Sequence, residues 1–209
     1  MYYYWSEEIT KSDCEKIINE FDTSKSVDAT TGNYQKTLYP EEIEEYKKNG
    51  NWDFDKNQPK NINTPDESTR KTKLNWLPLQ HKFNKILSEY VTKANTIMYH
   101  YDIGKFTPSQ FARYDVGDFY NYHQDSGHNI VEYEKETRKL SMTVQLSDPD
   151  TYEGGQFFFY NGNKEEEEPE IQKQGSILVF DSRMWHRVAP VTKGVRYSLV
   201  SWVLGPHFR

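Results

Sequence analysis

The fold is decided by residues 175–204, GSILVFDSRMWHRVAPVTKGVRYSLVSWVL, where short apolar runs alternate with turn residues. The runs 176–181, 185–191 and 196–204 are rich in β-branched and aromatic side chains. Such runs, bounded by glycine or polar clusters, predict β-strands. We expect residues 189–194 to form a hairpin connection that makes His186 and Arg196 close to cross-strand partners.

The same pattern extends upstream to about residue 105, with glycines and an Asp-Pro-Asp cluster between the runs. Five further strands are expected at 106–115, 118–125, 139–147, 155–162 and 169–174. About eight short strands with even punctuation are typical of an antiparallel sandwich or jelly roll. The predicted fold class is therefore mainly β with flanking α-helices.

The flanking helices are predicted in the first half of the chain. Ser12 and Glu15 have the spacing of a capping box, with Ser12 as the N-cap of a short amphipathic helix. Residues 39–50 are typical of a surface helix that ends at Gly50. A helix at about 79–97 would place seven side chains on one apolar face: Leu79, Phe83, Ile86, Leu87, Tyr90, Val91 and Ala94.

Composition divides the chain into two parts. Residues 1–104 are expected to form a helical support region with a polar insertion at about 22–72, and residues 105–209 a core within one compact domain. The insertion is rich in Asn, Lys, Asp, Thr and Glu, and 53–69 is typical of a loop. A solvated insertion and a substrate lid both remain open as interpretations of this segment.

Charge and cysteine content exclude several classes of function. The 209 residues carry a net charge of −6, which argues against general affinity for nucleic acids or anionic membranes. One cysteine, Cys14, excludes a disulfide framework within the chain and a cysteine-based zinc site. The first ten residues do not resemble a signal peptide, and no apolar stretch is long enough to cross a bilayer. A cytoplasmic protein is expected.

His123, Asp125 and His186 are the candidate metal ligands. Residues two apart in a strand point to the same face, so His123 and Asp125 would aim together, and His186 follows on a later strand. Two imidazoles and one carboxylate that leave coordination positions open are the ligand set of non-heme Fe(II) oxygenases. The spacing alone is weak, because His100 and Asp102 repeat it between the second helix and the first strand, where we interpret it as chance.

Arg196 and Ser198 strengthen the prediction. Strand alternation puts both on one side, and a guanidinium there suits the distal carboxylate of a short dicarboxylate such as 2-oxoglutarate. A single buried histidine is usually structural and a single arginine is usually a surface cation. The four residues together, with the serine, indicate a metal and dicarboxylate site.

Three stretches carry a family resemblance: QFARYDVGDFYNYHQD, RKLSMTVQLSDPDTYEGGQFFF and GSILVFDSRMWHRVAPVTKGVRYSLVSWVLGPHFR. Together they resemble the 2-oxoglutarate- and Fe(II)-dependent oxygenases of the prolyl 4-hydroxylase-like group, most of all the PKHD-type hydroxylases of bacteria and phages. The resemblance covers about 105–209, and STRKTKLNWLP at 68–78 is similar to the stretch ahead of the family's helix.

The resemblance implies a double-stranded β-helix (jelly-roll) core and a role for each matching residue. His123, Asp125 and His186 would bind iron, and Arg196 would anchor the co-substrate. Tyr114 and Tyr120 match tyrosines that line the 2-oxoglutarate pocket, while Thr143 and Gln145 lie on the strand that walls it. Ser198 joins this set as a co-substrate-binding residue.

The implied cofactors are Fe(II), 2-oxoglutarate and O2, with ascorbate as reductant. 2-Oxoglutarate would be decarboxylated to succinate and CO2 while an unactivated C–H bond is hydroxylated. Related halogenases replace the carboxylate ligand with a small residue, so the presence of Asp125 favours hydroxylation.

Four functions compete at this point. The leading one is a peptidyl hydroxylase that acts on proline in a peptide or protein; the second is an oxygenase of a free amino acid or other small molecule. A nucleic-acid demethylase would usually carry an arginine six positions after Arg196, where this chain has Trp202. A non-catalytic jelly-roll module has no need for all four site residues. The Asn-, Lys- and Tyr-rich composition favours an AT-rich phage or bacterial genome.

Overall fold

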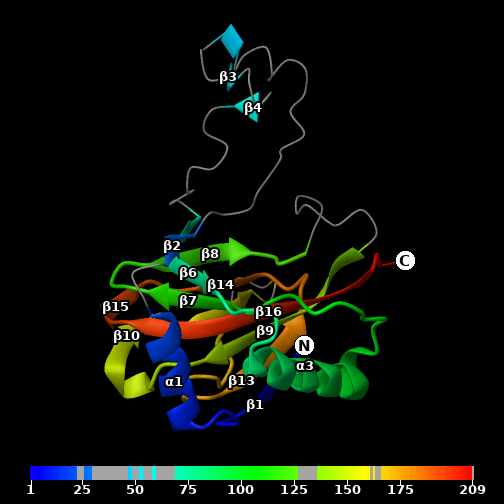
Figure 1. Ribbon diagram of the computed structural model, residues 1–209, viewed down its shortest axis with the longest axis horizontal. Coiled ribbons are helices and arrows are strands. Elements are labelled where there is room, and N and C mark those ends of the chain that lie inside the picture. The colour runs from blue at the N-terminus through cyan, green and yellow to red at the C-terminus, as the bar shows by residue number, and fades with distance from the viewer. Residues whose placement is uncertain are drawn as a thin grey trace.

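The computed structural model describes residues 1–22, 26–29, 47–48, 52–53, 58–59, 69–126, 136–160, 162 and 166–208 (Figure 1). The helical segments are α1 (Lys11–Phe21), α3 (Lys82–Ala94), the π-helical turn Asn95–Tyr99 and the 3₁₀ turn Pro149–Thr151. The strands are β1 (Tyr2–Trp5), β2 (Val27–Asp28), β3 (Trp52–Asp53), β4 (Gln58–Pro59), β5 (Arg70–Lys71), β6 (Lys73–Trp76), β7 (Gln110–Tyr114), β8 (Phe119–His123), β9 (Glu136–Gln145), β10 (Tyr152–Gly154), β11 (Phe157–Tyr160), β12 (Glu166–Glu167), β13 (Ile177–Asp181), β14 (His186–Val188), β15 (Val191–Gly194) and β16 (Arg196–Pro206).

Two antiparallel sheets form the body of the described chain. The larger has seven strands in the order β1-β13-β9-β16-β7-β6-β2, and the smaller has five in the order β12-β11-β14-β8-β5. Strands adjacent in space are mostly distant in sequence, as in β16 between β9 and β7. This is a jelly-roll core, and it confirms the predicted mainly β fold with flanking helices.

Strand alternation divides the larger sheet into two buried faces. Along β9, Leu140, Met142 and Val144 face a cluster shared with the helices, while the intervening Ser141, Thr143 and Gln145 are also buried. Residues two apart share a face of the sheet. The apolar set therefore packs on the helices, and the polar set faces the smaller sheet.

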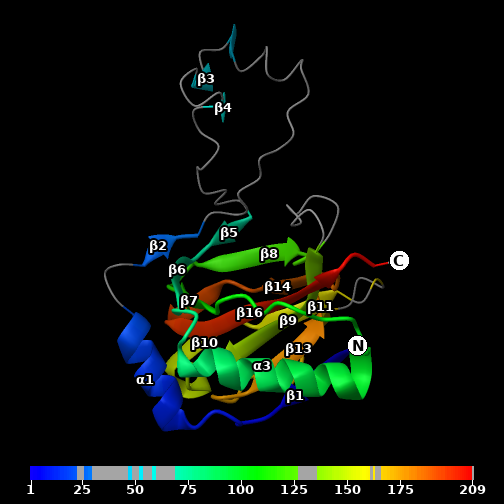
Figure 2. The ribbon, with the colours of Figure 1, turned by 45° about the vertical axis from the view of Figure 1, so that its right-hand side comes forward.

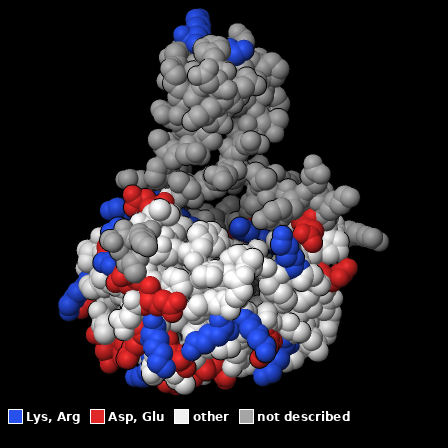
Figure 3. Space-filling view, in the orientation of Figure 1, with Lys and Arg blue, Asp and Glu red and all other residues white. Residues whose placement is uncertain are grey.

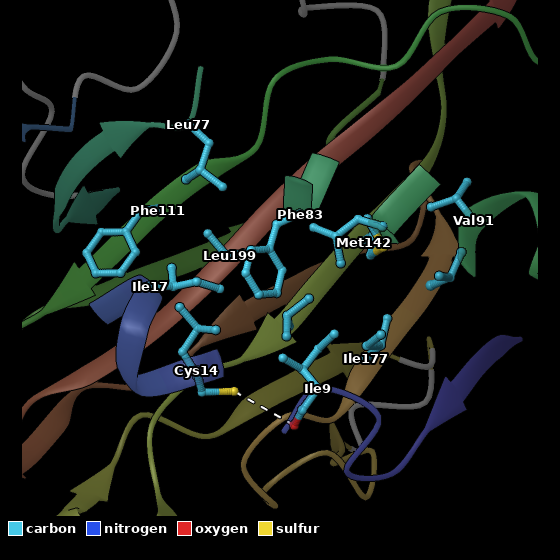
Figure 4. Packing of buried hydrophobic residues seen from close by; sticks show 14 of the residues in the cluster. Ile9, Cys14, Ile17, Leu77, Phe83, Val91, Phe111, Met142, Ile177 and Leu199 are labelled. Atoms are coloured by element: carbon cyan, nitrogen blue, oxygen red, sulfur yellow. Dashed lines mark hydrogen bonds between the residues drawn. The ribbon is translucent and has the colours of Figure 1, made fainter. Parts of the chain in front are cut away.

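The helices cover the outer face of the larger sheet (Figures 1 and 2). Cys14 and Ile17 of α1 and Phe83 of α3 meet Met142 and Leu199 in one apolar cluster (Figure 4). Burying a side chain of this size contributes roughly 1.5–3 kcal/mol. The helices thus hold the larger sheet from outside and leave its inner face for the site.

The helix predicted at about 79–97 exists, with shifted ends. It begins at Lys82, with the His81 side chain accepting a hydrogen bond from the Phe83 N–H, and runs on as a π-helical turn to Tyr99. Four of the expected face residues are buried, but Leu79 lies before the helix and is 64% exposed. Leu79 belongs to the link 77–81 between β6 and α3, ahead of the N-cap His81, and Pro78 in this link disfavours helical backbone at the residue before it.

The first helix corrects the predicted cap. The N-cap is Thr10, whose hydroxyl accepts a hydrogen bond from the Asp13 N–H at 3.1 Å, and not Ser12. Ile9 before the cap and Cys14 in the first turn belong to the same apolar cluster, and the Cys14 thiol donates to the Ile9 carbonyl at 4.0 Å (Figure 4). This is a hydrophobic staple, which sets where the helix starts.

One predicted strand is wrong. Residues 169–174 form no strand, because Pro169 cannot donate to a ladder and the Ile171 N–H turns back to the Pro169 carbonyl at 2.7 Å. The turn that follows depends on Gly175, at φ 83°, where an added Cβ would lie 1.9 Å from the Ile9 carbonyl oxygen. The buried Ile171 side chain instead enters the core between the sheets.

Three predictions in the first half remain untested. Most of the predicted surface helix at 39–50 and most of the insertion at 22–72 lie outside the described residues, and the division at residue 104 stays a prediction. Strands β1, β2 and β6, which precede residue 104, join the same sheet as β7, β9 and β16.

The described surface carries both signs of charge. On the face seen in Figure 3, Lys and Arg lie interspersed with Asp and Glu over the part of the chain that the structure describes. Within the described ranges, no helix has both the length and the apolar character that crossing a bilayer requires.

Candidate active site

His123 and His186 face each other across two strands of the smaller sheet. His123 ends β8, His186 begins β14, and they are direct partners in the antiparallel ladder. Their ring centroids lie 4.1 Å apart. The strand pairing by itself therefore brings together two histidines that are separated by about sixty residues of sequence.

Asp125 joins them because the chain after β8 turns back toward β14. The backbone N–H groups of Asp125 and Ser126 both donate to the Ser182 carbonyl at 2.9 Å. The Asp125 carboxylate oxygens then lie 3.7 Å from His123 Nε2 and 3.5 Å from His186 Nε2. Among the described residues, these three are the His, Cys, Asp or Glu group whose ligand atoms all lie within 4.8 Å of one another.

Both imidazoles are held in the same tautomer. His123 Nδ1 lies 2.8 Å from the Asn121 carbonyl oxygen, and His186 Nδ1 lies 2.9 Å from the Met184 carbonyl oxygen. A carbonyl only accepts hydrogen bonds, so each Nδ1 carries the proton. Each Nε2 therefore presents a lone pair toward Asp125, as metal-binding histidines do.

One oxygen of the Asp125 carboxylate is left without a hydrogen-bond donor among the described residues. Asp125 Oδ2 is buried and has no hydrogen-bond partner in the described chain. Burial alone would raise the pKa of Asp125, but His186 and His123 beside it hold the pKa at about 2. Burial, together with neighbouring His186, lowers the pKa of His123 to about 3. Two lone pairs and an anion thus converge, and a divalent cation fits this donor set.

Aromatic rings enclose the three ligands. The Tyr120 ring stacks on the His123 ring with centroids 3.5 Å apart, and the Arg70 guanidinium lies 4.4 Å from the Tyr120 ring centroid. Burial raises the pKa of Tyr120 to about 12, so this phenol stays neutral. On the other side, the Phe180 ring lies 4.7 Å from His186.

Arg196 belongs to the opposite sheet, which corrects the predicted hairpin. Residues 191–194 form β15, which pairs with β10, and Arg196 begins β16 as the partner of Tyr114. His186 and Arg196 are thus not cross-strand neighbours. They lie on the two facing sheets of the sandwich, because the chain crosses from one sheet to the other between them.

The Arg196 side chain is buried without a counter-ion. It is 2% exposed, its guanidinium lies 5.6 Å from the Tyr114 ring centroid, and it has no hydrogen bond or ion pair within the described residues. An isolated buried charge is costly, so a bound anion would stabilise it. The adjoining wall contains the other predicted residues: Ser198 pairs with Gln145, and Thr143 pairs with Val200.

The second His-x-Asp pair lies outside the site. His100 caps the π-helical turn in a left-handed conformation, and both His100 and Asp102 are exposed.

Sequence reasoning missed four residues near the site. Arg70 and Trp202 are buried, and each has one N–H without a hydrogen-bond partner in the described chain. Tyr152 and Phe157 line a cavity beside Arg196. Arg70 lies in the stretch 68–78 that resembles the family, but that stretch of sequence does not indicate which residue its guanidinium contacts. Tyr152 lies between two clusters of turn residues, so no strand or helix pattern in the sequence indicated that its side chain lines the site.

Comparisons with known proteins agree with this geometry. Residues 109–204 match the model of the 2OG-Fe(II) oxygenase superfamily. A PKHD-type hydroxylase from Stenotrophomonas maltophilia is 35% identical over 102 residues, which are 47% of this chain and 44% of the relative. One from Synechococcus is 32% identical over 90 residues, 43% of this chain and 39% of the relative. The matched stretch thus spans less than half the length of these curated relatives.

Solved structures extend the likeness of the fold to nearly the whole chain. A Pseudomonas putida prolyl-4-hydroxylase has a TM-score of 0.66 at 15% identity, covering 99% of this chain and 93% of that one. The viral collagen prolyl hydroxylase of Paramecium bursaria Chlorella virus-1, in its 2-oxoglutarate complex, has a TM-score of 0.62 at 17% identity, covering 98% and 96%. Residues 109–204 thus resemble the 2OG-Fe(II) oxygenase superfamily in sequence, and the fold of the chain is similar to that of solved prolyl hydroxylases.

Proposed function

We propose that this chain is a 2-oxoglutarate- and Fe(II)-dependent dioxygenase that hydroxylates proline in a peptide or protein. One observation carries the proposal. Three ligand atoms, none of which carries a hydrogen, converge on one point, and across the sandwich from them lies a buried guanidinium that has no counter-ion among the described residues. His123, Asp125 and His186 would hold the iron. Arg196 would bind the distal carboxylate of 2-oxoglutarate, with Tyr114, Ser198, Thr143 and Gln145 as the surrounding wall.

The protein's own residues orient and enclose the reactants. The Asn121 and Met184 carbonyls fix the two imidazoles, so metal entry needs no ring rotation. Rings such as Tyr120 and Phe180 exclude water around the ligands. Bound iron, with 2-oxoglutarate and O2, supplies the oxidation of a C–H bond, with succinate and CO2 as co-products.

Two unpaired donors favour a polypeptide substrate. Arg70 Nε and Trp202 Nε1 are buried without partners in the described chain, which is costly unless a ligand accepts from them. Arg70 lies against Tyr120, and the Arg138 guanidinium lies 4.0 Å from the Trp202 ring. Peptide carbonyls would satisfy such donors, and an apolar proline ring packs well on aromatic faces. The fold shared with prolyl hydroxylases supports proline as the target.

The cellular setting is part of the proposal. Cys14 is a buried free thiol whose pKa is raised to about 12, chiefly by burial, so it is inert. We expect the enzyme to work in the reducing cytoplasm with ascorbate as reductant.

Succinate release tests the proposal. Purified protein with Fe(II), 2-oxoglutarate and ascorbate should release much more succinate with a proline-containing peptide than with free proline. Mass spectrometry of a treated host lysate should then find peptides that gain one oxygen. Equal turnover with free proline would favour the small-molecule oxygenase, and no succinate with either, in protein shown to bind Fe(II), would overturn the proposal.

A further inference from the structure

A cavity lies beside the buried Arg196 side chain. It has a volume of about 220 Å³, and Gln145, Tyr152, Phe157 and Arg196 are among the residues that line it. The Phe157 ring also stacks on His186 at 5.4 Å, so the cavity adjoins the proposed metal ligands. Among the described residues that line it, Arg196 is the one cation, and the one acidic residue, Glu168, is exposed and accepts a hydrogen bond from Gln172.

The hydrogen bonds of Gln145 leave the Tyr152 hydroxyl with a hydrogen to donate. Gln145 is 2% exposed, and its Nε2 donates to the Ser147 carbonyl at 3.3 Å and to Tyr152 Oη at 2.7 Å. Because the carbonyl can only accept, the NH2 end of the amide must face it. Tyr152 Oη therefore accepts the second amide hydrogen and keeps its own hydrogen to donate. Within the described residues that hydrogen has no acceptor.

Gly155 brings the tyrosine and the arginine to one place. Its φ is 65°, and an added Cβ would lie 2.8 Å from Arg196 Cδ and 3.5 Å from Tyr152 Cε2. The arginine stem and the tyrosine ring thus both pack against this glycine. A larger residue there would push into the arginine stem.

We propose that Tyr152 is a second anchor for the distal carboxylate of 2-oxoglutarate. Its hydroxyl donates to one carboxylate oxygen while the Arg196 guanidinium binds the other, and Gln145 orients the hydroxyl. This inference rests on the proposed function. A neutral donor beside the guanidinium adds selectivity for a ligand with a terminal carboxylate, because a carboxylate offers an acceptor oxygen to each donor and carries the charge that the guanidinium needs.

A pair of ligands tests this role. 2-Oxovalerate has the carbon chain of 2-oxoglutarate but ends in a methyl group, so it lacks the distal carboxylate. Binding of each to Mn(II)-loaded protein is measured by anaerobic calorimetry, with competition titration for the weaker ligand. Tyr152→Phe should weaken 2-oxoglutarate about tenfold or more, as expected for a lost hydrogen bond to a charged group. It should leave 2-oxovalerate unchanged.

Matched variants separate the possible outcomes. Tyr160→Phe, at a half-exposed tyrosine elsewhere on the smaller sheet, should change neither affinity. Gln145→Leu should weaken the binding of 2-oxoglutarate less than Tyr152→Phe does, since the hydroxyl remains but is no longer oriented.

The outcomes that would overturn the inference are distinct. If Tyr152→Phe binds both ligands as the unmodified protein does, or binds both more weakly by the same factor, Tyr152 is not an anchor. If 2-oxoglutarate binds while Arg196→Met alone reduces its affinity, this inference fails and the proposed function stands. If 2-oxoglutarate does not bind at all, both fail.

Discussion

At the scale of single residues, the metal ligands are prepared by contacts with their own neighbours in sequence. Each histidine bonds through Nδ1 to the carbonyl two residues before it, Asn121 for His123 and Met184 for His186. Each strand end thus orients Nε2 through a contact within its own segment of the chain. Asp125 then supplies the anion that two neutral rings need to hold a divalent cation.

Removing the carboxylate should abolish metal binding without unfolding the chain. We expect Asp125→Ala to weaken Mn(II) or Fe(II) binding by more than about 100-fold, beyond the loss typical of an outer hydrogen-bond partner. Calorimetry measures the affinity, and circular dichroism checks the fold. Asp102→Ala is the matched control, because it removes the same residue type from the exposed second motif; equal losses in both variants would contradict the assignment.

Arg196 is expected to lower the stability of the ligand-free protein and to be required for its stabilisation by 2-oxoglutarate. Without 2-oxoglutarate, Arg196→Met is expected to raise the free energy of unfolding by about 1 kcal/mol, since a buried charge without a partner is replaced by an apolar chain. Thermal denaturation measures this. Added 2-oxoglutarate should raise the Tm of the unmodified protein and leave that of the variant unchanged. A variant less stable than its parent would indicate that Arg196 has a structural partner.

At the scale of elements, the start of α1 is decided by packing as well as by capping. Thr10 with Asp13 and Ser12 with Glu15 both satisfy a capping pattern in sequence. The Ile9 N–H donates to the Gly175 carbonyl at 3.1 Å, and its side chain packs with Cys14. This attachment places Ile9 just before the cap and so selects Thr10.

Substitution of the two hydroxyls separates the two caps. Thr10→Ala should lower the free energy of unfolding by about 1 kcal/mol, whereas Ser12→Ala should change it by less than about 0.5 kcal/mol. Urea denaturation followed by circular dichroism measures both. The reverse order would restore Ser12 as the N-cap.

At the scale of the whole molecule, the layers are joined by polar links as well as by apolar packing. Asp181, at the end of β13, accepts hydrogen bonds from Tyr101 Oη and Arg183 Nη2, each at 2.6 Å. Tyr101 follows the π-helical turn, so this carboxylate connects the helical layer to the larger sheet. Burial alone would raise the pKa of Asp181, but Arg183 and Tyr101 hold it below its usual value of 3.8.

This link predicts a pH dependence of stability. A carboxyl whose pKa is lowered by folding stabilises the protein above its unfolded pKa, and that contribution is lost as the pH falls through the folded pKa. Asp181→Asn should therefore lower the urea midpoint of the metal-free protein near pH 7, and the difference should shrink as the pH falls below the usual carboxyl pKa of 3.8 and through the lower folded pKa. A difference independent of pH would show that packing, not charge, is responsible.

The sequence by itself determined the residue types of the site and the strands that carry them. The period of two in β9 and β16 and the glycine punctuation predicted a mainly β fold, and the spacing of His123 and Asp125 predicted a shared direction. These are local properties, since they depend on residues within a few positions of one another. The wrong strand at 169–174 and the misplaced cap are local patterns that tertiary packing overrode.

Only the tertiary structure decided which strands meet. It paired His186 with His123 and Arg196 with Tyr114, and so placed the proposed iron ligands and the proposed co-substrate anchor on opposite sheets instead of on one hairpin. It also brought Arg70 onto Tyr120 and Tyr152 beside Arg196. Pairing between distant strands depends on burial and register across the whole sandwich, which no short window of sequence contains.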